Sequence, residues 1–280
     1  MGIRIVTDST AEFTLEEARS LEVTVVPLKS IFEDAEYLDG IDLTSDEFYE
    51  KLATAKTLPK TSQPSPYEFE QAFRTIQAEG HQIITICLTS SLSGTYQSAR
   101  QAKELCGGDI WVIDSHTATL GIQILVKRAL QLIESGIPAH ELVDILEVEK
   151  NSICLYAKLD TLEYLYKGGR LSKTSALVGT ALNMKPLVSV LEGRLSTAGK
   201  CIGTKKAFRE VFRLVDQEGG IDYSKPFAIG YTGSRDQFRE FEQICRERFG
   251  ENEPIVGSIG SVIGTHAGPG GAAVVFFRNV

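Results

Sequence analysis

Short apolar runs alternate with amphipathic segments through the first half of the chain, and this alternation most restricts the fold. The apolar runs lie at residues 3–7, 24–28, 82–88 and 109–114, and the run at 82–88 is rich in β-branched residues. Segments with helical periodicity separate them. Strands that alternate with helices in this way indicate a parallel sheet covered by helices.

Three helix starts are marked by capping boxes, in which Ser or Thr is followed three residues later by Glu. They begin at Thr14, Thr44 and Ser65, and Pro66 takes the first helical position after the third. The sequence predicts helices from these three starts and two more at residues 95–105 and 119–135.

The second half has a different pattern. Strands are expected at residues 153–159, 187–191, 194–201, 226–232, 254–259 and 272–277, and helices at 161–166, 173–182, 205–217 and 235–249. Glu192-Gly193 falls between two of these strands and predicts a hairpin turn. This order of elements is typical of a mixed sheet.

The sequence therefore predicts an α/β protein of two domains. Residues 1–150 form an N-terminal domain with a parallel sheet flanked by helices, and residues 151–280 form a C-terminal α/β domain with a mixed sheet. No stretch rich in Pro, Ser or Gly marks the boundary near Asn151. We therefore expect the two domains to share a large interface.

Composition narrows the function classes. The formal net charge is −8 and the pI is about 5.2, which argues against broad binding to nucleic acid or to anionic membranes. No apolar run reaches transmembrane length, and the N-terminus has no apolar signal core, so no stable membrane insertion is expected. The five cysteines are scattered without C-x-x-C spacing, as in reduced proteins. We expect a cytoplasmic monomer.

The segment Ser90-Ser91-Leu92-Ser93-Gly94-Thr95 is the first candidate for chemistry. It follows an expected strand directly and begins an expected helix. Free amides and the positive end of the helix dipole favour an anion there, and open α/β sheets bind ligands at this edge. Ser93 is therefore a candidate anion ligand. The alternative is that Ser93 only caps its helix.

A second cluster, Thr61-Ser62-Gln63-Pro64-Ser65-Pro66, holds two hydroxyls on a stiff segment. The prolines keep the backbone extended and then start a helix, so Thr61 and Ser62 are expected to be exposed. An ordinary loop that leads into a helix explains the same pattern, so both interpretations stay open.

The remaining candidates are set among glycines. His266 lies in a run with Gly264, Gly268, Gly270 and Gly271, which predicts an unusual backbone path or a close approach of backbone to a ligand. A lone histidine is more often structural, but this setting favours a functional role.

Arg170 ends Lys167-Gly168-Gly169-Arg170. It is expected either to balance the charge of an anion or to belong to a glycine helix cap. Asp8, after the first strand, is either a functional carboxylate or a cap for loop amides.

Several catalytic and binding motifs are absent from the sequence. It has no phosphate-binding G-x-x-x-x-G-K-[ST], no G-x-G-x-x-G after the first strand and no G-x-S-x-G around Ser93. No His, Cys, Asp or Glu spacing is typical of a metal site, so neither a metal nor another cofactor is expected.

Seven segments together resemble the DegV family of bacterial fatty-acid-binding proteins, in the family's order and along the whole chain. The third is one residue shorter than the family pattern around its leucine. The matching segments are residues 5–11, 61–66, 90–99, 112–115, 164–170, 185–187 and 264–270.

The resemblance implies a two-domain α/β fold with an acyl chain in a tunnel. It implies that Thr61 and Ser93 hold the carboxylate of a long-chain fatty acid, such as palmitate, stearate or oleate, and that His266 and Arg170 complete the network. Ser62, Gly94, Thr95 and Gly268 are expected in supporting positions. It also implies a partner, an ATP-dependent fatty-acid kinase that makes acyl phosphate for phospholipid synthesis.

The tail pocket is expected to come from apolar residues of the first half, such as Phe69, Phe73, Ile122 and Leu125. The second half is expected to contribute the loop that carries His266. Burial of the methylenes would supply the affinity, and hydrogen bonds would make the buried carboxylate tolerable.

Two other functions are weighed against this carrier. A serine hydrolase would use Ser93 as nucleophile and His266 as base, but no orienting carboxylate can be named and the nucleophile elbow is missing. We therefore do not expect an enzyme. A protein-interaction module would present a basic surface from Lys167, Arg170, Lys173, Lys200, Lys205 and Lys206, which is otherwise a solvated face.

Overall fold

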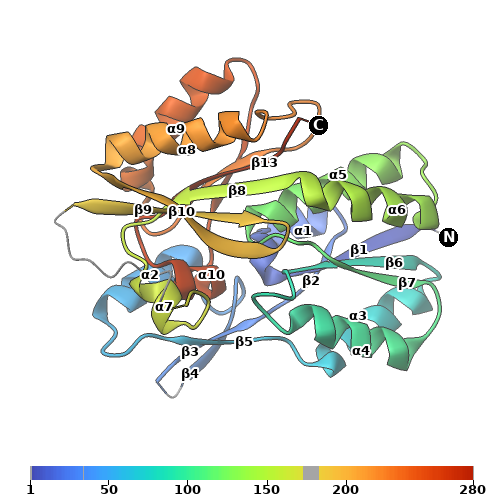
Figure 1. Ribbon diagram of the computed structural model, residues 1–280. Coiled ribbons are helices and arrows are strands. Elements are labelled where there is room, and N and C mark those ends of the chain that lie inside the picture. The colour runs from blue at the N-terminus through green and yellow to red at the C-terminus, as the bar shows by residue number, and fades with distance from the viewer. Residues whose placement is uncertain (1, 34, 173–182, 280) are drawn as a thin grey trace.

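The computed structural model describes residues 2–33, 35–172 and 183–279, and within them the chain forms three sheets. The first is parallel, with strands in the order β2-β1-β6-β7 (Figure 1). Its strands are β1 (Ile3–Asp8), β2 (Thr24–Val26), β6 (Gln82–Cys87) and β7 (Ile110–Asp114). The predicted parallel sheet is confirmed.

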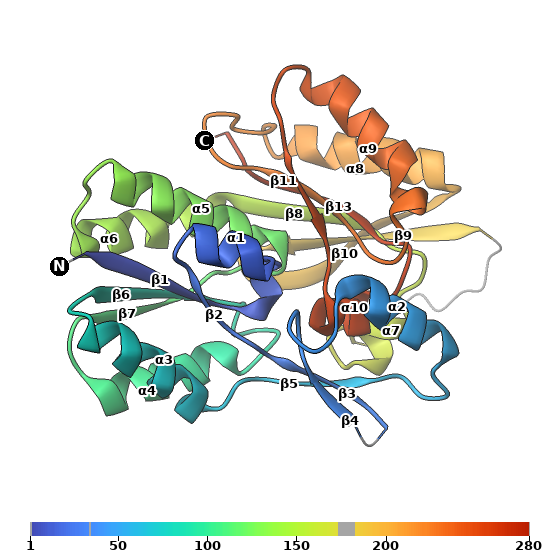
Figure 2. The ribbon, with the colours of Figure 1, turned by 180° about the vertical axis from the view of Figure 1, so that it is seen from behind.

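Helices cover both faces of this sheet. One face packs against α1 (Leu15–Ser20), α5 (Leu120–Glu134) and α6 (Ala139–Glu149), and the other packs against α3 (Pro66–Ala78) and α4 (Thr95–Cys106) (Figure 2). The three predicted capping boxes are present at Thr14, Thr44 and Ser65. Helix α6 was not predicted from the sequence.

The second sheet is mixed, with strands in the order β10-β9-β8-β13-β11-β12. Its neighbours are antiparallel except for β11 and β12, which are parallel. Helices α8 (Thr204–Gln217) and α9 (Arg235–Phe249) cover its outer face (Figure 1). The strands are β8 (Ile153–Lys158), β9 (Met184–Leu191), β10 (Arg194–Ile202), β11 (Ala228–Tyr231), β12 (Ile255–Ser258) and β13 (Ala272–Phe277).

The turn between β9 and β10 is the predicted hairpin. Glu192 and Gly193 both have positive φ, 46° and 79°, as a type I′ turn requires. The helix predicted at residues 173–182 lies outside the described residues.

A small antiparallel sheet, β4-β3-β5, was not predicted. Its strands are only three or four residues long, too short for a period of two to show: β3 (Lys29–Phe32), β4 (Ala35–Leu38) and β5 (Lys60–Ser62). Helices α2 (Ser45–Thr54), α7 (Glu163–Lys167) and α10 (Ser261–Ala267) lie near it (Figure 2). Two 3₁₀ helices, η1 (Ser9–Ala11) and η2 (Lys150–Ser152), complete the described elements.

Helix α5 lies between the parallel and the mixed sheets. It contacts strands of both, and nine of its fifteen residues are buried. The core around it joins side chains of the first half, such as Ile84, to side chains of the second half, such as Leu155 and Val190. The two halves therefore share one core, which accounts for the lack of a flexible linker. The domain boundary near Asn151 stays a prediction.

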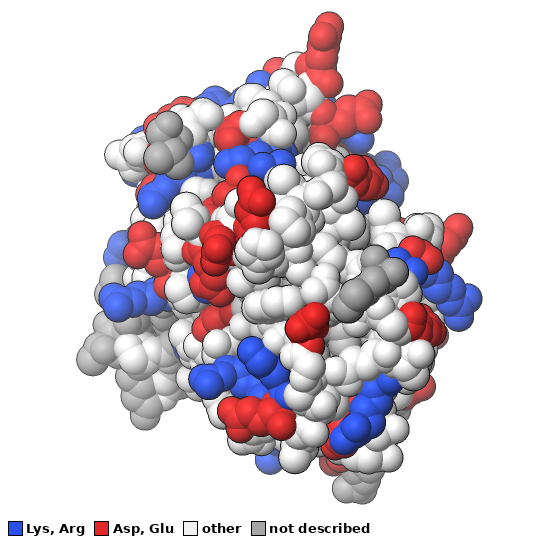
Figure 3. Space-filling view, turned by 90° about the vertical axis from the view of Figure 1, so that its right-hand side faces the viewer, with Lys and Arg blue, Asp and Glu red and all other residues white. Residues whose placement is uncertain are grey.

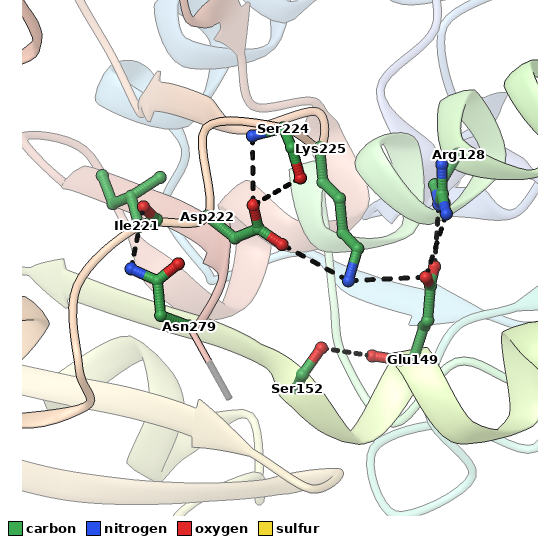
Figure 4. Close-up of polar contacts among 8 residues, drawn as sticks. All are labelled: Arg128, Glu149, Ser152, Ile221, Asp222, Ser224, Lys225 and Asn279. Carbon is green, nitrogen blue, oxygen red and sulfur yellow. Dashed lines mark hydrogen bonds and ion pairs between the residues drawn. The ribbon is translucent and has the colours of Figure 1, made fainter.

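An ion-pair network that includes a residue of α5 also joins the halves. Arg128 on α5 donates to both oxygens of Glu149, through Nε at 2.9 Å and Nη2 at 3.1 Å (Figure 4). The Nζ atom of Lys225, from the loop before β11, lies 3.4 Å from Glu149 Oε1 and 3.4 Å from Asp222 Oδ2. Glu149 is thus a carboxylate of the first half held by a cation of the second.

Charges of both signs are mixed over one face of the molecule. Figure 3 shows Lys and Arg groups beside Asp and Glu groups there, with an uncharged stretch between them. A surface of this kind gives no extended field of one sign on that face.

Candidate functional site

An apolar cavity of about 170 Å³ lies between the mixed sheet and the first half of the chain. Its walls come mainly from the inner face of β8, β9 and β13, from α10, and from loops of the first half. The apolar lining residues include Leu28, Leu88, Leu92, Ala118, Leu155, Ala157, Leu159, Leu165, Val188, Val190, Leu195, Ile259, Val262, Ile263, Ala272 and Ala273.

The expected source of the tail pocket in the first half is wrong for this cavity. Phe69 and Phe73 belong to a separate core between the parallel sheet and helices α3 and α4. Ile122 and Leu125 are fully buried in the shared core but do not line the cavity. The second half supplies most of the wall because the inner face of its mixed sheet faces the first half.

Thr61 and His266 meet at this cavity. Thr61 lies in β5, His266 lies in the last turn of α10, and Thr61 Oγ1 is 3.0 Å from His266 Nε2. Both side chains line the cavity. The other ring nitrogen, Nδ1, is buried and has no hydrogen-bond partner within the described ranges.

The setting of His266 differs from the expected glycine loop. His266 belongs to a helix, and Gly264 inside that helix allows close packing, because a Cβ there would lie 2.6 Å from Phe48 Cε1 and from Tyr49 Oη. The unusual backbone path begins after the histidine, at Gly268 and Gly270, whose φ values are 70° and 79°. The prediction placed the irregular segment too early.

Gly168 makes room for the imidazole of His266. A Cβ at Gly168 would lie 2.2 Å from His266 Nδ1, so a larger residue there displaces the ring. The next residue, Gly169, has a φ of 74° and follows the end of α7, as in a glycine cap. The capping interpretation of this segment therefore holds for Gly169, and Gly168 has a packing role that the sequence analysis missed.

Arg170 also lines the cavity. Its Nε donates to the carbonyl of Leu92 at 3.2 Å and its Nη1 to the carbonyl of Gly168 at 2.8 Å. Burial lowers the pKa of Arg170, but a guanidinium keeps its charge at neutral pH. Arg170 therefore brings a fixed positive charge beside His266.

Burial and, to a smaller extent, the nearby charge of Arg170 together lower the pKa of His266 to about 4. The imidazole is therefore neutral at neutral pH. A neutral ring has one donor and one acceptor nitrogen. If Nε2 carries the proton, it donates to Thr61 and leaves the Thr61 hydroxyl free to donate elsewhere.

Ser93 lies on the same cavity, just before α4. The cap position itself is Gly94, which makes no side-chain cap, while Ser93 Oγ accepts from the Thr95 amide at 3.3 Å and lies 2.9 Å from Thr95 Oγ1. Ser93 thus contributes to the helix start and faces the cavity as well. Within the described part of the chain, no hydrogen bond joins it to His266.

Gln63 is a cavity residue that the sequence analysis did not single out. Its side chain lies against Gly94, where a Cβ would be 2.1 Å from Gln63 Oε1, and its Nε2 donates to Ser98 Oγ at 3.0 Å. Gln63 therefore joins the segment that carries Thr61 to the segment that carries Ser93. Its position inside the T-S-Q-P pattern was the available signal.

The four supporting residues do not line the cavity. Ser62 donates weakly to the Gln63 carbonyl at 3.4 Å, and Thr95 is buried at the start of α4. Gly94 makes room for Gln63, and Gly268 makes room for the ring of Tyr164, 2.3 Å from a Cβ placed there. Their roles in binding stay predictions.

Asp8 acts as a loop cap. Its carboxylate accepts from the amides of Thr10 at 3.0 Å and Leu88 at 2.8 Å. Burial raises its pKa to about 6.

Among the residues that the structure describes, no group of three or more His, Cys, Asp or Glu side chains is arranged to hold a metal ion. In the same ranges, every helix is too short or too polar to cross a membrane.

Fold and site together define an α/β protein with a buried apolar cavity that ends in a cluster of hydroxyl, imidazole and guanidinium groups. The sequence profile of the DegV family, described as an uncharacterised protein family, matches residues 2–279. The chain belongs to the DegV family.

Relatives match this chain over nearly the full length of both chains. A DegV domain-containing protein of Deinococcus radiodurans is 37% identical over 279 residues, which are 98% of each chain. A fatty-acid-binding DegV family protein from Thermus thermophilus has a solved structure that superposes with a TM-score of 0.90, at 31% identity and with 100% of both chains covered. A stearic-acid-binding protein from Eubacterium ventriosum gives 0.87, at 26% identity and 97% coverage of both.

Proposed function

We propose that this protein binds one long-chain fatty acid, with the acyl chain in the apolar cavity and the carboxylate at Thr61, Ser93, Arg170 and His266. The observation that carries the proposal is the contact between Thr61 and His266 at the wall of that cavity. The fatty-acid binding of the Thermus and Eubacterium relatives supports it.

The energetics favour such a ligand. Each buried methylene contributes about 0.8 kcal/mol, so a long chain gains on the order of 10 kcal/mol before the costs of association. A carboxylate is costly to bury unless donors replace its water. The hydroxyls of Thr61 and Ser93 and the guanidinium of Arg170 are such donors, and the neutral imidazole of His266 orients Thr61 without a charge of its own.

The proposed role is that of a carrier rather than an enzyme. A hydrolase would need a base in contact with Ser93, but Ser93 bonds to Thr95 and His266 bonds to Thr61. We expect no turnover of acyl esters by the protein alone. A Ser93-dependent esterase activity would favour the hydrolase instead.

In the finer proposal, the loaded protein acts as a cytoplasmic monomer and presents the carboxylate to an ATP-dependent fatty-acid kinase. The kinase would transfer the γ-phosphoryl group of ATP to a carboxylate oxygen and release ADP. Exposed lysines offer a docking surface, although Lys167 pairs with Glu163 at 2.5 Å and Lys205 pairs with Glu240 at 3.4 Å. Lys200 and Lys206 are also exposed, and Lys173 lies outside the described residues.

The binding test uses protein stripped of lipid and then offered palmitate or oleate. Native mass spectrometry should show one fatty acid per chain, and Thr61→Ala with Ser93→Ala should weaken the affinity at least tenfold. Thr75→Ala is the matched control, because Thr75 is an exposed helical threonine whose hydroxyl bonds to the Gln71 carbonyl. No uptake by the wild-type protein would falsify the proposal.

A further inference from the structure

Two carboxylates of the first half accept hydrogen bonds from the N-terminal end of α10. Glu12 Oε2 accepts from the Gly260 amide at 2.7 Å. Asp39 Oδ1 accepts from the Ser261 amide at 2.9 Å and from Ser261 Oγ at 2.6 Å. The first amides of a helix lack intrahelical partners, so these contacts satisfy donors that α10 would otherwise leave unpaired.

Both carboxylates are held in turn by other parts of the first half. Thr119 Oγ1 donates to Glu12 Oε1 at 2.9 Å, and Ser9 Oγ donates to Asp39 Oδ2 at 2.8 Å. Glu12 and Thr119 have positive φ values of 61° and 50°, which are costly for residues other than glycine. Their surroundings must therefore fix these two residues firmly.

The other end of α10 carries His266. Ser261 and His266 are five residues apart on one helix, a rise of about 7.5 Å. In the small sheet, Ser30 of β3 is paired with Thr61 of β5. Ser30 Oγ lies 2.6 Å from Ser261 Oγ, and Thr61 Oγ1 lies 3.0 Å from His266 Nε2, so neighbouring strands contact both ends of the helix.

We propose that Glu12 and Asp39 are positioning residues for the carboxylate site: they hold the N-terminal end of α10 against the first half and so set His266 against Thr61. Neither residue lines the cavity. A short helix moves as one body, so loss of an anchor at one end shifts the ring at the other. The consequence for fatty-acid affinity rests on the proposed function.

We expect the hydrogen bonds of Glu12 and Asp39, rather than their negative charge, to hold the N-terminal end of α10 in place. Burial raises the pKa of Glu12 well above its ordinary value, and the nearby Asp39 raises it further. A glutamine at position 12 can bond to both partners of Glu12. Its side-chain carbonyl can accept from the Gly260 amide, and its side-chain amide can donate to the Thr119 hydroxyl, which accepts as well as donates.

The test compares Glu12→Ala and Asp39→Ala with the conservative Glu12→Gln and Asp39→Asn. The first readout is the NMR titration of His266, assigned with His266→Gln, which requires no fatty acid. In the alanine variants its pKa should rise from about 4 toward the ordinary 6.5, because the ring becomes more exposed. The second readout is oleate affinity, expected to fall about tenfold in the alanine variants and less than threefold in the conservative ones.

Glu149→Ala is the matched control. It also removes a carboxylate that joins the two halves, but in the network of Figure 4, on α6 rather than near α10. It should lower the melting temperature and leave both readouts unchanged. Should Glu12→Ala not fold, Ser261→Ala removes one donor to Asp39 and tests the same end of the helix.

An unchanged His266 titration in folded Glu12→Ala and Asp39→Ala overturns the proposal, and so does an equal loss of affinity in Glu149→Ala. If the wild-type protein binds no fatty acid, the proposed function fails. The titration of His266 then still decides the positioning roles of Glu12 and Asp39.

Discussion

Thr61 and His266 are separated by 205 residues, and their side chains lie 3.0 Å apart. The contact joins β5 of the small sheet to the last turn of α10, and so joins the two halves of the chain at the cavity. A substitution that separates these two side chains should therefore weaken ligand binding more than it lowers the stability of the fold.

The first prediction concerns the hydroxyl of Thr61. Thr61→Val keeps the shape but removes the donor, which should weaken oleate binding by about 1.5–3 kcal/mol, the order of one hydrogen bond to a charged group. Thr61→Ser keeps the hydroxyl and should stay close to the wild type. Isothermal titration of delipidated protein measures both. Equal affinities for Val and Ser would exclude Thr61 as a carboxylate donor.

The second prediction concerns the space beside His266. Gly168→Ala places a methyl group 2.2 Å from Nδ1 and should displace the ring, with a large loss of affinity and a rise in the pKa of His266. Gly169→Ala is the matched control, because nothing lies within 4 Å of its Cβ and its cost is the strained φ of 74° alone.

Gly169→Ala should therefore lower stability by about 1 kcal/mol and leave the affinity unchanged. Thermal unfolding and oleate titration separate the two effects. If Gly168→Ala binds oleate as the wild type does, the ring of His266 has no part in binding.

The third prediction concerns pH. The pKa of His266 is about 4 in the folded protein and near 6.5 when unfolded. The unfolded chain therefore takes up this proton first as pH falls, so the stability that His266 contributes is full above pH 6.5 and is lost toward pH 4.

His266→Gln should be spared this loss, which amounts to about 3 kcal/mol at most. Urea unfolding from pH 7 to pH 4 measures the difference. The comparison with the variant is needed because Asp8 and Asp39 have raised pKa values in the folded protein. These two groups therefore increase the stability as pH falls through this range, whereas His266 decreases it. Parallel pH profiles for both proteins would contradict the buried neutral ring.

A bound carboxylate should reverse this shift. An anion beside His266 favours the imidazolium, so the pKa of His266 should rise on addition of oleate. The NMR titration in the presence and absence of ligand measures it. An uncharged ligand of the same length, oleyl alcohol, should leave the pKa unchanged, and an equal rise with the alcohol would show that the carboxylate lies elsewhere.

The last prediction concerns the width of the cavity. Ala157 of β8 and Ala273 of β13 are paired across the strands, and both line the cavity. Ala157→Leu and Ala273→Leu should fill this space and abolish binding of long chains. Because they occupy a void, they should cost little stability. Full retention of oleate would place the acyl chain outside this cavity.

The sequence by itself determined much of the local structure, although α6 and the strands of the small sheet were not predicted. Capping boxes at Thr14, Thr44 and Ser65 and the turn at Glu192-Gly193 depend on contacts within a few residues, and the structure contains them all. The parallel and mixed sheets followed from the hydrophobic pattern. The motifs that resemble the DegV family also named Thr61, Ser93, Arg170 and His266, which the structure brings to one cavity.

Tertiary structure decided what depends on distant contacts. Phe69 and Phe73 were expected to line the cavity, but the inner face of the mixed sheet forms most of its wall. Only the packing of the two sheets determines which apolar face remains unfilled. Helix α10 has only seven residues, one of them Gly264, so its own propensity is weak, and Glu12 and Asp39 supply the bonds at its start. The packing role of Gly168 likewise depends on His266, which lies 98 positions further along the chain. A local sequence pattern carries no information about which distant side chain will occupy the space beside a glycine.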